Sequence, residues 1–452
     1  MGKPAAFDLT FNIRRQRFYV NLYGETGGFA SPFTLNTYDI REHPMKTWRS
    51  TFTAIVAAET LAVAGFATSI PIIPLYLQDL GINDPVKLKY WTGLIQSATA
   101  ISLAVFAPIW GSLADSYGKR LMLLRAMMGG AFVVGLMAFV TNPWQLLALR
   151  VLQGCLTGTV AAATVLVAGL VPAVSVGFAL GLLQTGVSIG NSLGPLIGGV
   201  VSDFMGRRTV FFATSLLLLA AGLITMLGVE NDRKDLPSKL EMKARIPFDY
   251  SVVFRSPVLF SLLAVIFTLQ MANSVASPML PLFIQQMTVD PGRVGSTTGI
   301  VLGAGAAAAA VAATLVGRFS GKLGYTRTLL LCLAGGALFT LPQAFAATPV
   351  QLVVFRVLSM LFLGGAMPAV NALIAVHADR NRQGGIFGLS SSIASIGLAL
   401  GPAIGSLVAA AFDYRAVFVV TSIILALTVA GMRFAAPALV VRTPAGPPPP
   451  LN

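Results

Sequence analysis

The chain has 452 residues, of which 55% are hydrophobic and only 11% are charged, and its mean hydropathy is +0.78. A soluble domain carries about 25% charged residues because its surface faces water, so this composition excludes a soluble protein and indicates a surface that faces lipid. The net charge of +14 would suit a nucleic-acid partner. However, the basic residues lie in short loops between long apolar runs and form no single patch or arm, so we expect no nucleic acid.

Twelve apolar runs follow one another along the chain. A helix that crosses the hydrocarbon core of a bilayer needs about 20 mainly apolar residues, and each run is long enough. We predict an all-α integral membrane protein with about twelve transmembrane helices, embedded in the lipid bilayer of a bacterial cytoplasmic membrane as a multi-pass protein. The predicted spans are residues 51–77, 91–113, 121–140, 143–170, 177–203, 209–229, 257–285, 294–316, 328–346, 349–375, 384–411 and 414–436.

The loops between these spans differ in charge. Lys and Arg collect after the second, eighth and tenth spans and in the segment 230–256, whereas the opposite loops hold few. Cytoplasmic loops are the ones that collect basic residues, so both termini are predicted to be cytoplasmic. Residues 1–50 lack an apolar run of signal-peptide length and are expected to form a flexible cytoplasmic extension. Residues 437–452 are rich in proline and are expected to be a disordered tail.

The second six spans repeat the first six. The sequence "PIIPLYLQ" at 71–78 returns as "PMLPLFIQ" at 278–285, an offset of 207 residues, and "SIGNSLGPLIGG" at 188–199 returns as "SIGLALGPAIGS" at the same offset. Parallel repeats related by an axis along the membrane normal are typical of transporters that bind substrate between their halves; a purely structural duplication is the alternative. The predicted bundles and the cytoplasmic linker between them are residues 51–229, 257–436 and 230–256.

A charged turn, "GSLADSYGKR" at 111–120, joins the second and third spans. It resembles the signature loop of the major facilitator superfamily, G-x-L-a-D-r-x-G-r-r. Its glycines let two helix ends approach closely, and its carboxylate can bind the positive N-terminus of a neighbouring helix. We expect the loop to act as a conformational latch, weaker in the second copy at 317–327, which has no acid. The latch residues are Gly111, Asp115, Gly118, Lys119 and Arg120.

The fifth span carries glycine at every fourth position, which gives one helix face a smooth groove for close packing. Simple helix packing would explain such a stripe. The sequence "GVSIGNSLGPLIGG" also resembles the glycine-rich antiporter signature that ends in G-P-x-x-G-G, and this resemblance implies an exporter. We expect the stripe to pack against a similar one in the eighth span, at Gly295, Gly299 and Gly303, as a seal against leak. The motif residues are Gly186, Gly190, Gly194, Pro195, Gly198 and Gly199.

The fourth span contains "LLALRVLQG", which resembles the family's Arg-x-x-Gln-Gly motif through Arg150, Gln153 and Gly154. An arginine inside a membrane helix normally faces a partner or a water-filled cavity, and Arg356 is its counterpart in the second repeat. Together the motifs resemble the twelve-helix drug:proton antiporters of the superfamily over nearly all of 48–436, most closely the MdtG-type bacterial drug exporters.

One acidic residue that lies inside a predicted span, away from its ends, breaks the repeat. Glu59 lies about eight residues into the first span, roughly 12 Å along a helix, and its counterpart 207 residues later is Ile266. A carboxyl group there, with Arg150 as a nearby cation, suits a group that loads and releases a proton. A static Glu59–Arg150 ion pair and a solvated glutamate at the cytoplasmic mouth are the alternatives.

For the substrate site we select aromatic, methionine and polar side chains at helical spacing on the first, fourth, seventh and tenth spans. Such mixed surfaces suit amphipathic, often aromatic compounds, although packing roles remain the alternative at each position. The candidates are Phe66, Gln153, Gln270, Asn273, Arg356 and Met360.

We therefore expect a monomeric secondary transporter that exports amphipathic small molecules in exchange for protons, with a single-metabolite exporter as the alternative. The chain has no Gly-x-x-x-x-Gly-Lys-Ser/Thr loop for ATP, so the protonmotive force is the expected energy source, with no cofactor or metal. A membrane enzyme is disfavoured because the two histidines, His43 and His377, lie outside mid-span and no catalytic or metal cluster can be assembled. A receptor or scaffold with the same fold is a third reading.

Overall fold

The computed structural model describes residues 7–12, 17–22, 45–172, 175–230, 256–288, 290–378 and 383–439. Most of the predicted linker and the proline-rich tail lie outside these residues. The chain divides into two compact units, Met1–Thr47 and Trp48–Asn452.

The first unit contains an antiparallel pair of strands that the sequence analysis did not predict. Strand β1 (Phe7–Asn12) pairs with strand β2 (Arg17–Leu22), with Phe7 opposite Leu22 and Asn12 opposite Arg17.

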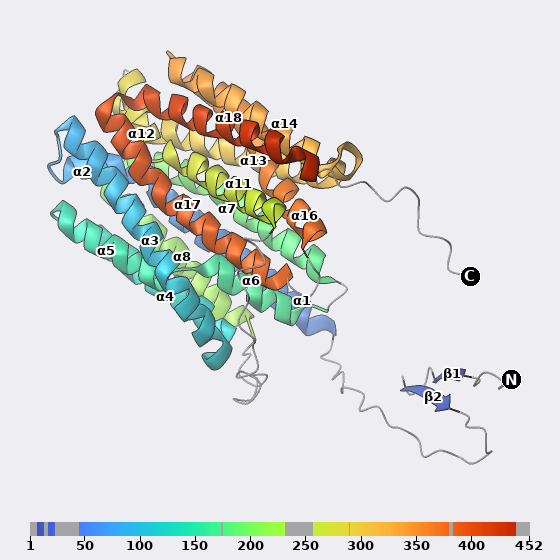
Figure 1. The fold of residues 1–452 in the computed structure, drawn as a ribbon. Helices are drawn as coiled ribbons and strands as arrows, with labels where there is room; N and C mark the ends of the chain where they lie inside the picture. The colour runs from blue at the N-terminus through green and yellow to red at the C-terminus, as the bar shows by residue number, and fades with distance from the viewer. Residues whose placement is uncertain are drawn as a thin grey trace. The chain divides into compact units, whose positions relative to one another are not determined.

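In the second unit the described residues contain twelve helical spans long and apolar enough to cross a membrane (Figure 1). The prediction of twelve is confirmed, and most predicted boundaries fall within a few residues of the observed ones. The first six spans consist of α1 (Met45–Ser69), η1 (Ile70–Ile72) and α2 (Ile73–Asp79), then α3 (Pro85–Tyr117), α4 (Lys119–Met137), α5 (Pro143–Leu156) with α6 (Thr159–Leu170), α7 (Val176–Met205) and α8 (Arg207–Gly228). The second six consist of α11 (Pro257–Val275) with α12 (Leu280–Met287), η4 (Pro291–Arg293), α13 (Val294–Leu323), α14 (Tyr325–Thr340) with η5 (Leu341–Phe345), α15 (Pro349–Leu363) with α16 (Ala366–His377), α17 (Gln383–Ala411) and α18 (Tyr414–Leu439).

Helix breaks occur at corresponding places in the two halves. Pro71 and Pro74 lie where α1 passes through η1 into α2, because proline has no N–H for the helix ladder. Their counterparts Pro278 and Pro281 lie where α11 passes into α12. The fourth and tenth spans are broken as well, and Gly158 between α5 and α6 has φ 125°, a conformation that favours glycine.

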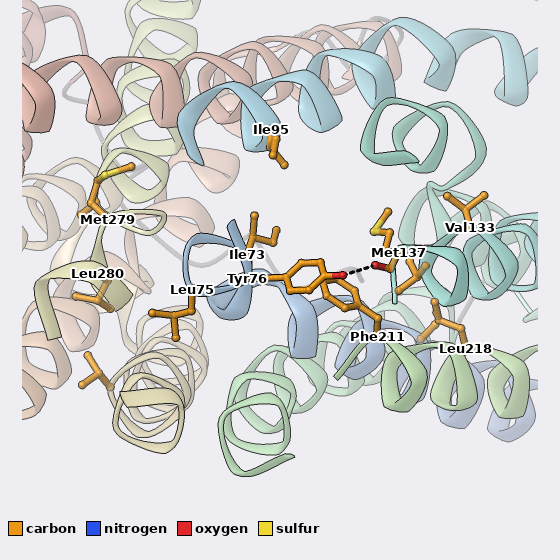
Figure 2. Close-up of a cluster of buried hydrophobic side chains, with 14 of the residues drawn as sticks. Ile73, Leu75, Tyr76, Ile95, Val133, Met137, Phe211, Leu218, Met279 and Leu280 are labelled. Atoms are coloured by element: carbon orange, nitrogen blue, oxygen red, sulfur yellow. Dashed lines mark hydrogen bonds between the residues drawn. The ribbon is translucent and has the colours of Figure 1, made fainter. Parts of the chain in front are cut away.

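The packing of aromatic side chains also repeats between the two halves. The rings of Tyr76 and Phe211 lie 4.8 Å apart, and those of their counterparts Phe283 and Phe418 lie 5.4 Å apart. Figure 2 shows Tyr76 inside the buried cluster, where its hydroxyl donates to the Met137 carbonyl oxygen at 3.0 Å. This bond satisfies a carbonyl at the end of α4, where the helix ladder leaves it open.

Contacts between the halves involve two equivalent helix pairs, α7 with α13 and α3 with α17. One large buried cluster includes residues of the first half together with Val275, Met279, Leu280 and Phe283 of the second half. These side chains belong to the end of the bundle at which α2 and α12 lie, on the upper left of Figure 1. The halves therefore share one buried apolar core at this end.

Candidate functional site

Glu59 is fully buried in α1 and is the one acidic residue in the buried part of the described chain. Its Oε1 accepts a hydrogen bond from Thr159 Oγ1 at 2.8 Å, and its Oε2 is buried without a partner. Thr159 is the first residue of α6, directly after the break at Gly158. The carboxyl group thus lies at a helix N-terminus, where the peptide dipoles favour negative charge.

Arg150 is buried on α5 but makes no ion pair with Glu59; the ion pairs of the described residues lie elsewhere. Its Nη1 donates to Gln153 Oε1 at 3.2 Å and its Nη2 donates to Ser69 Oγ at 3.5 Å. The static Glu59–Arg150 pair is therefore not formed in this structure, and the carboxyl and guanidinium groups have separate neutral partners.

Arg356, the counterpart of Arg150, is buried on α15, and its Nε has no hydrogen-bond partner. Its side chain and that of Met360 pack over Gly305 of α13: an added Cβ there would lie 3.1 Å from Arg356 Cγ and 3.4 Å from Met360 Cγ. Because glycine has no side chain, the aliphatic part of the Arg356 side chain can pack closely against α13 at this point.

The other substrate-site candidates pack against separate neighbours. The Phe66 ring lies over Gly130 of α4, and the Gln270 side chain lies beside Gly397 of α17. Asn273 on α11 has a buried Oδ1 without a hydrogen-bond partner. Each half thus contributes polar groups, and Asn273 and Arg356 retain unused hydrogen-bonding capacity.

The latch loop is tied to helices of its own half. Gly118 has φ 101° at the turn between α3 and α4, which explains the need for glycine there, and Gly111 lies in open space. Lys119 Nζ donates to the Val165 carbonyl oxygen at 3.4 Å, and Arg120 Nη2 donates to that of Met226 at 2.6 Å. The side chain of Asp115 lies outside the described residues.

The glycine stripe of the fifth span faces a different helix from the one expected. Gly186, Gly190, Gly194 and Gly198 pack against α1, and an added Cβ at Gly194 would lie 2.5 Å from the Ala64 carbonyl oxygen. The expected contact with the eighth span is present, but another face of α7 makes it. The residues in this contact are Ser192, Pro195, Leu196 and Gly199 of α7 and Gly295, Gly299 and Gly303 of α13. The stripe therefore joins helices within one half, and the adjacent face joins the halves.

Sequence reasoning missed Thr159 as the partner of Glu59. The two residues are 100 positions apart. The one local indication is "TGT" at 157–159, whose glycine predicts a helix break followed by a new helix start.

Comparison with known protein families shows the family to which this chain belongs. The model of the Major Facilitator Superfamily matches residues 55–349 and 294–451.

The chain belongs to the Major Facilitator Superfamily.

Bacterial members of this superfamily are similar in sequence to this chain over most of their length. The multidrug resistance protein MdtG of Yersinia enterocolitica is 35% identical over 365 residues, which is 80% of this chain and 87% of the relative. MdtG of Enterobacter lignolyticus is 34% identical over 378 residues, which is 83% of this chain and 90% of the relative. Together with the twelve spans, these relatives identify a multi-pass protein of the bacterial inner membrane.

Solved structures of superfamily transporters share the fold. A bacterial homologue of the human lysosomal transporter Spinster gives a TM-score of 0.71 at 14% identity, covering 86% of this chain and 97% of its own. The nucleoside transporter NupG gives 0.64 at 15% identity, covering 87% of this chain and 100% of its own. At these identities the likeness concerns the arrangement of the helices.

Proposed function

We propose that the protein is a multidrug exporter that moves amphipathic small molecules out of the cytoplasm in exchange for protons, by alternating access between its two halves. The export role is supported by the MdtG multidrug resistance proteins, which match it over at least 80% of its length. The basic residues of the linker and of the loops on its side of the bundle support cytoplasmic termini. The protonmotive force supplies the energy without a bound cofactor.

The environment of Glu59 is the observation that carries the proton coupling. A carboxylate inside a membrane bundle is costly unless it is paired, and among the residues that the structure describes Glu59 has one neutral donor and no cation. Protonation at Oε2 makes the group neutral while Oε1 keeps its hydrogen bond from Thr159. The site can therefore hold the carboxyl group in either form with little rearrangement, as a group that exchanges a proton requires.

The hydrogen bond from Thr159 links the protonation state of Glu59 to the start of helix α6. The threonine begins α6 at the break after Gly158, where the backbone is held by fewer helix hydrogen bonds than in mid-helix. A change of charge on Glu59 alters the interaction with this helix end, and α6 packs directly against α4 and α7. Proton loading thus has a physical route to a movement of the first half.

The substrate surface draws on both halves. Phe66 and Gln153 belong to the first half and Gln270, Asn273, Arg356 and Met360 to the second. Aromatic and methionine surfaces adapt to varied apolar ligands, while the few polar atoms orient them. An exporter of one metabolite, such as a sugar or amino-acid derivative, is the second candidate, and a compound panel separates the two.

The decisive experiment is uphill transport by Glu59→Gln in vesicles with an imposed proton gradient, across a panel of cationic, neutral and anionic compounds. We expect loss of the substrate gradient, retained substrate binding, and binding that no longer depends on pH. Thr159→Val should weaken coupling, whereas Thr164→Val is the matched control, because Thr164 donates to the Val160 carbonyl oxygen of its own helix. A Glu59→Gln protein that still builds a gradient collapsed by an uncoupler would place the coupling acid elsewhere.

A further inference from the structure

Three polar contacts join the two halves at the end of the bundle where α2 and α12 lie. The first is between the last residues of the repeated "PIIPLYLQ" and "PMLPLFIQ" segments. Gln78 Nε2 donates to Gln285 Oε1 at 3.0 Å, and Gln285 Nε2 donates to Gln78 Oε1 at 3.3 Å. The two residues are counterparts in the repeat, 207 positions apart. A reciprocal bond between counterparts places this pair on the axis that relates the halves.

The second contact lies to one side of this axis, between α7 and α13. The Asp203 carboxylate, near the end of α7, accepts from the backbone N–H of Gly295 at 3.0 Å and from that of Ser296 at 2.7 Å. These are the second and third residues of α13, whose first N–H groups have no partner within the helix. An anion of the first half thus caps the N-terminus of a helix of the second half.

The third contact lies between α3 and the end of α17, the pair equivalent to α13 and α7. Lys89 is buried there; its Nζ donates to the Ala409 carbonyl oxygen at 2.8 Å and lies 4.4 Å from the centre of the Tyr414 ring. Ala409 is near the end of α17, whose last carbonyls have no partner within the helix. A cation of the first half thus binds the C-terminus of a helix of the second half.

The two lateral contacts are equivalent in position and opposite in charge. At the offset of 207, the counterpart of Ser296 is Lys89 and the counterpart of Asp203 is Ala410. Where one interface has an acid that reaches the N-terminus of the facing helix, the other has a base that reaches the C-terminus. Each charge matches the sign that the helix dipole favours, so both interfaces are stabilised although the side chains are not repeated.

We infer that Asp203 and Lys89, together with the Gln78–Gln285 pair on the axis between them, hold this end of the transporter closed as a gate, and that the gate opens when these contacts between the halves break. The inference rests on the proposed function, because it assigns these residues to one state of the alternating cycle. Met279, Leu280 and Leu75 belong to the buried apolar cluster that the two halves share, and in the closed gate these side chains keep water out. Asp203 and Lys89 are positioning residues: they set the balance between states and make no contact with substrate in this role.

The test measures the opening of this end directly. Spin labels are attached at Asn83→Cys, in the turn after α2, and at Gln286→Cys on α12, both exposed, in full-length protein with Cys155→Ala and Cys332→Ala, reconstituted in lipid nanodiscs. Pulsed electron resonance then gives the populations of short and long distances between the halves. A charge-assisted hydrogen bond contributes enough to change such a ratio about tenfold.

Asp203→Asn and Lys89→Met are each expected to lower the ratio of closed to open populations about tenfold, and Lys89→Arg should restore much of it. The matched control is Asp79→Asn, because Asp79 pairs with Arg207 at 2.7 Å at the same end but within the first half. It should change the ratio less than twofold. If either Asp203→Asn or Lys89→Met behaves like Asp79→Asn, the inferred gate is wrong. The distances need no proton gradient, so failure of the gate and failure of proton coupling in vesicles are separate results.

Discussion

The stripe of glycines on α7 allows a sharp test of helix packing, with Gly194→Ala as the perturbation. A Cβ atom at this position would lie 2.5 Å from the Ala64 carbonyl oxygen and 2.6 Å from Ala67 Cβ. Ordinary contacts between such atoms are about 3.5–4.0 Å, so α1 and α7 must separate by about 1 Å. A gap of this size forfeits roughly a quarter to a half of the dispersion energy of the surrounding contacts.

Overpacking of this kind typically costs about 1–3 kcal/mol, and we expect a loss of about 2 kcal/mol in the free energy of unfolding. The same helix provides the control, Gly181→Ala, because no atom lies within 4 Å of a Cβ added there. That change should leave the free energy of unfolding equal to that of the parent or raise it by up to about 1 kcal/mol, because alanine favours a helix more than glycine does. The assay is denaturation of the purified protein in mixed micelles, followed by helical circular dichroism. Equal midpoints for the two variants would refute the close packing of α7 on α1.

Three further outcomes are expected. Asp115→Asn should slow transport while leaving substrate binding to solubilised protein nearly intact, and a large loss of binding at unchanged turnover would contradict a latch role. Arg150→Lys keeps the charge but cannot donate in the same fork to both of its side-chain partners, so substrate binding should weaken while the pH profile of transport, which we assign to Glu59, keeps its midpoint. Tyr76→Phe should lower the free energy of unfolding by about 1 kcal/mol, since it removes the bond to Met137 and leaves the ring packing; an unchanged midpoint would show that the bond adds no net stability.

The architecture was predictable from the sequence because the relevant patterns are local. Apolar runs bounded by charges give the spans, and the repeated segments at 71–78 and 278–285 predict two equivalent halves. The glycines at every fourth position of the fifth span likewise show which face of α7 can pack closely against another helix. It does not show which neighbour covers that face, because α1 and α13 both offer small residues, and the structure assigns the stripe to α1.

The candidate site was less predictable because its contacts join distant parts of the chain. Glu59 was identified as a break in the repeat, yet its hydrogen-bond partner Thr159 carries no motif and lies on another span. Arg150 looked like a suitable counter-ion from residue type alone, but the side chain reaches Gln153 and Ser69 instead. The roles of the selected substrate residues stay predictions.

The presence of one buried carboxyl group in the described bundle has an energetic consequence. If Glu59 is the single coupling group, each cycle exchanges one proton for one substrate molecule. A neutral compound then draws on the whole protonmotive force, and every 100 mV is worth about 2.3 kcal/mol per elementary charge, or roughly a fiftyfold concentration ratio. A monovalent cation leaves as a proton enters, so no net charge crosses the membrane and only the pH difference drives its export. The same transporter would therefore concentrate neutral compounds more steeply than cationic ones in cells whose driving force is mainly electrical.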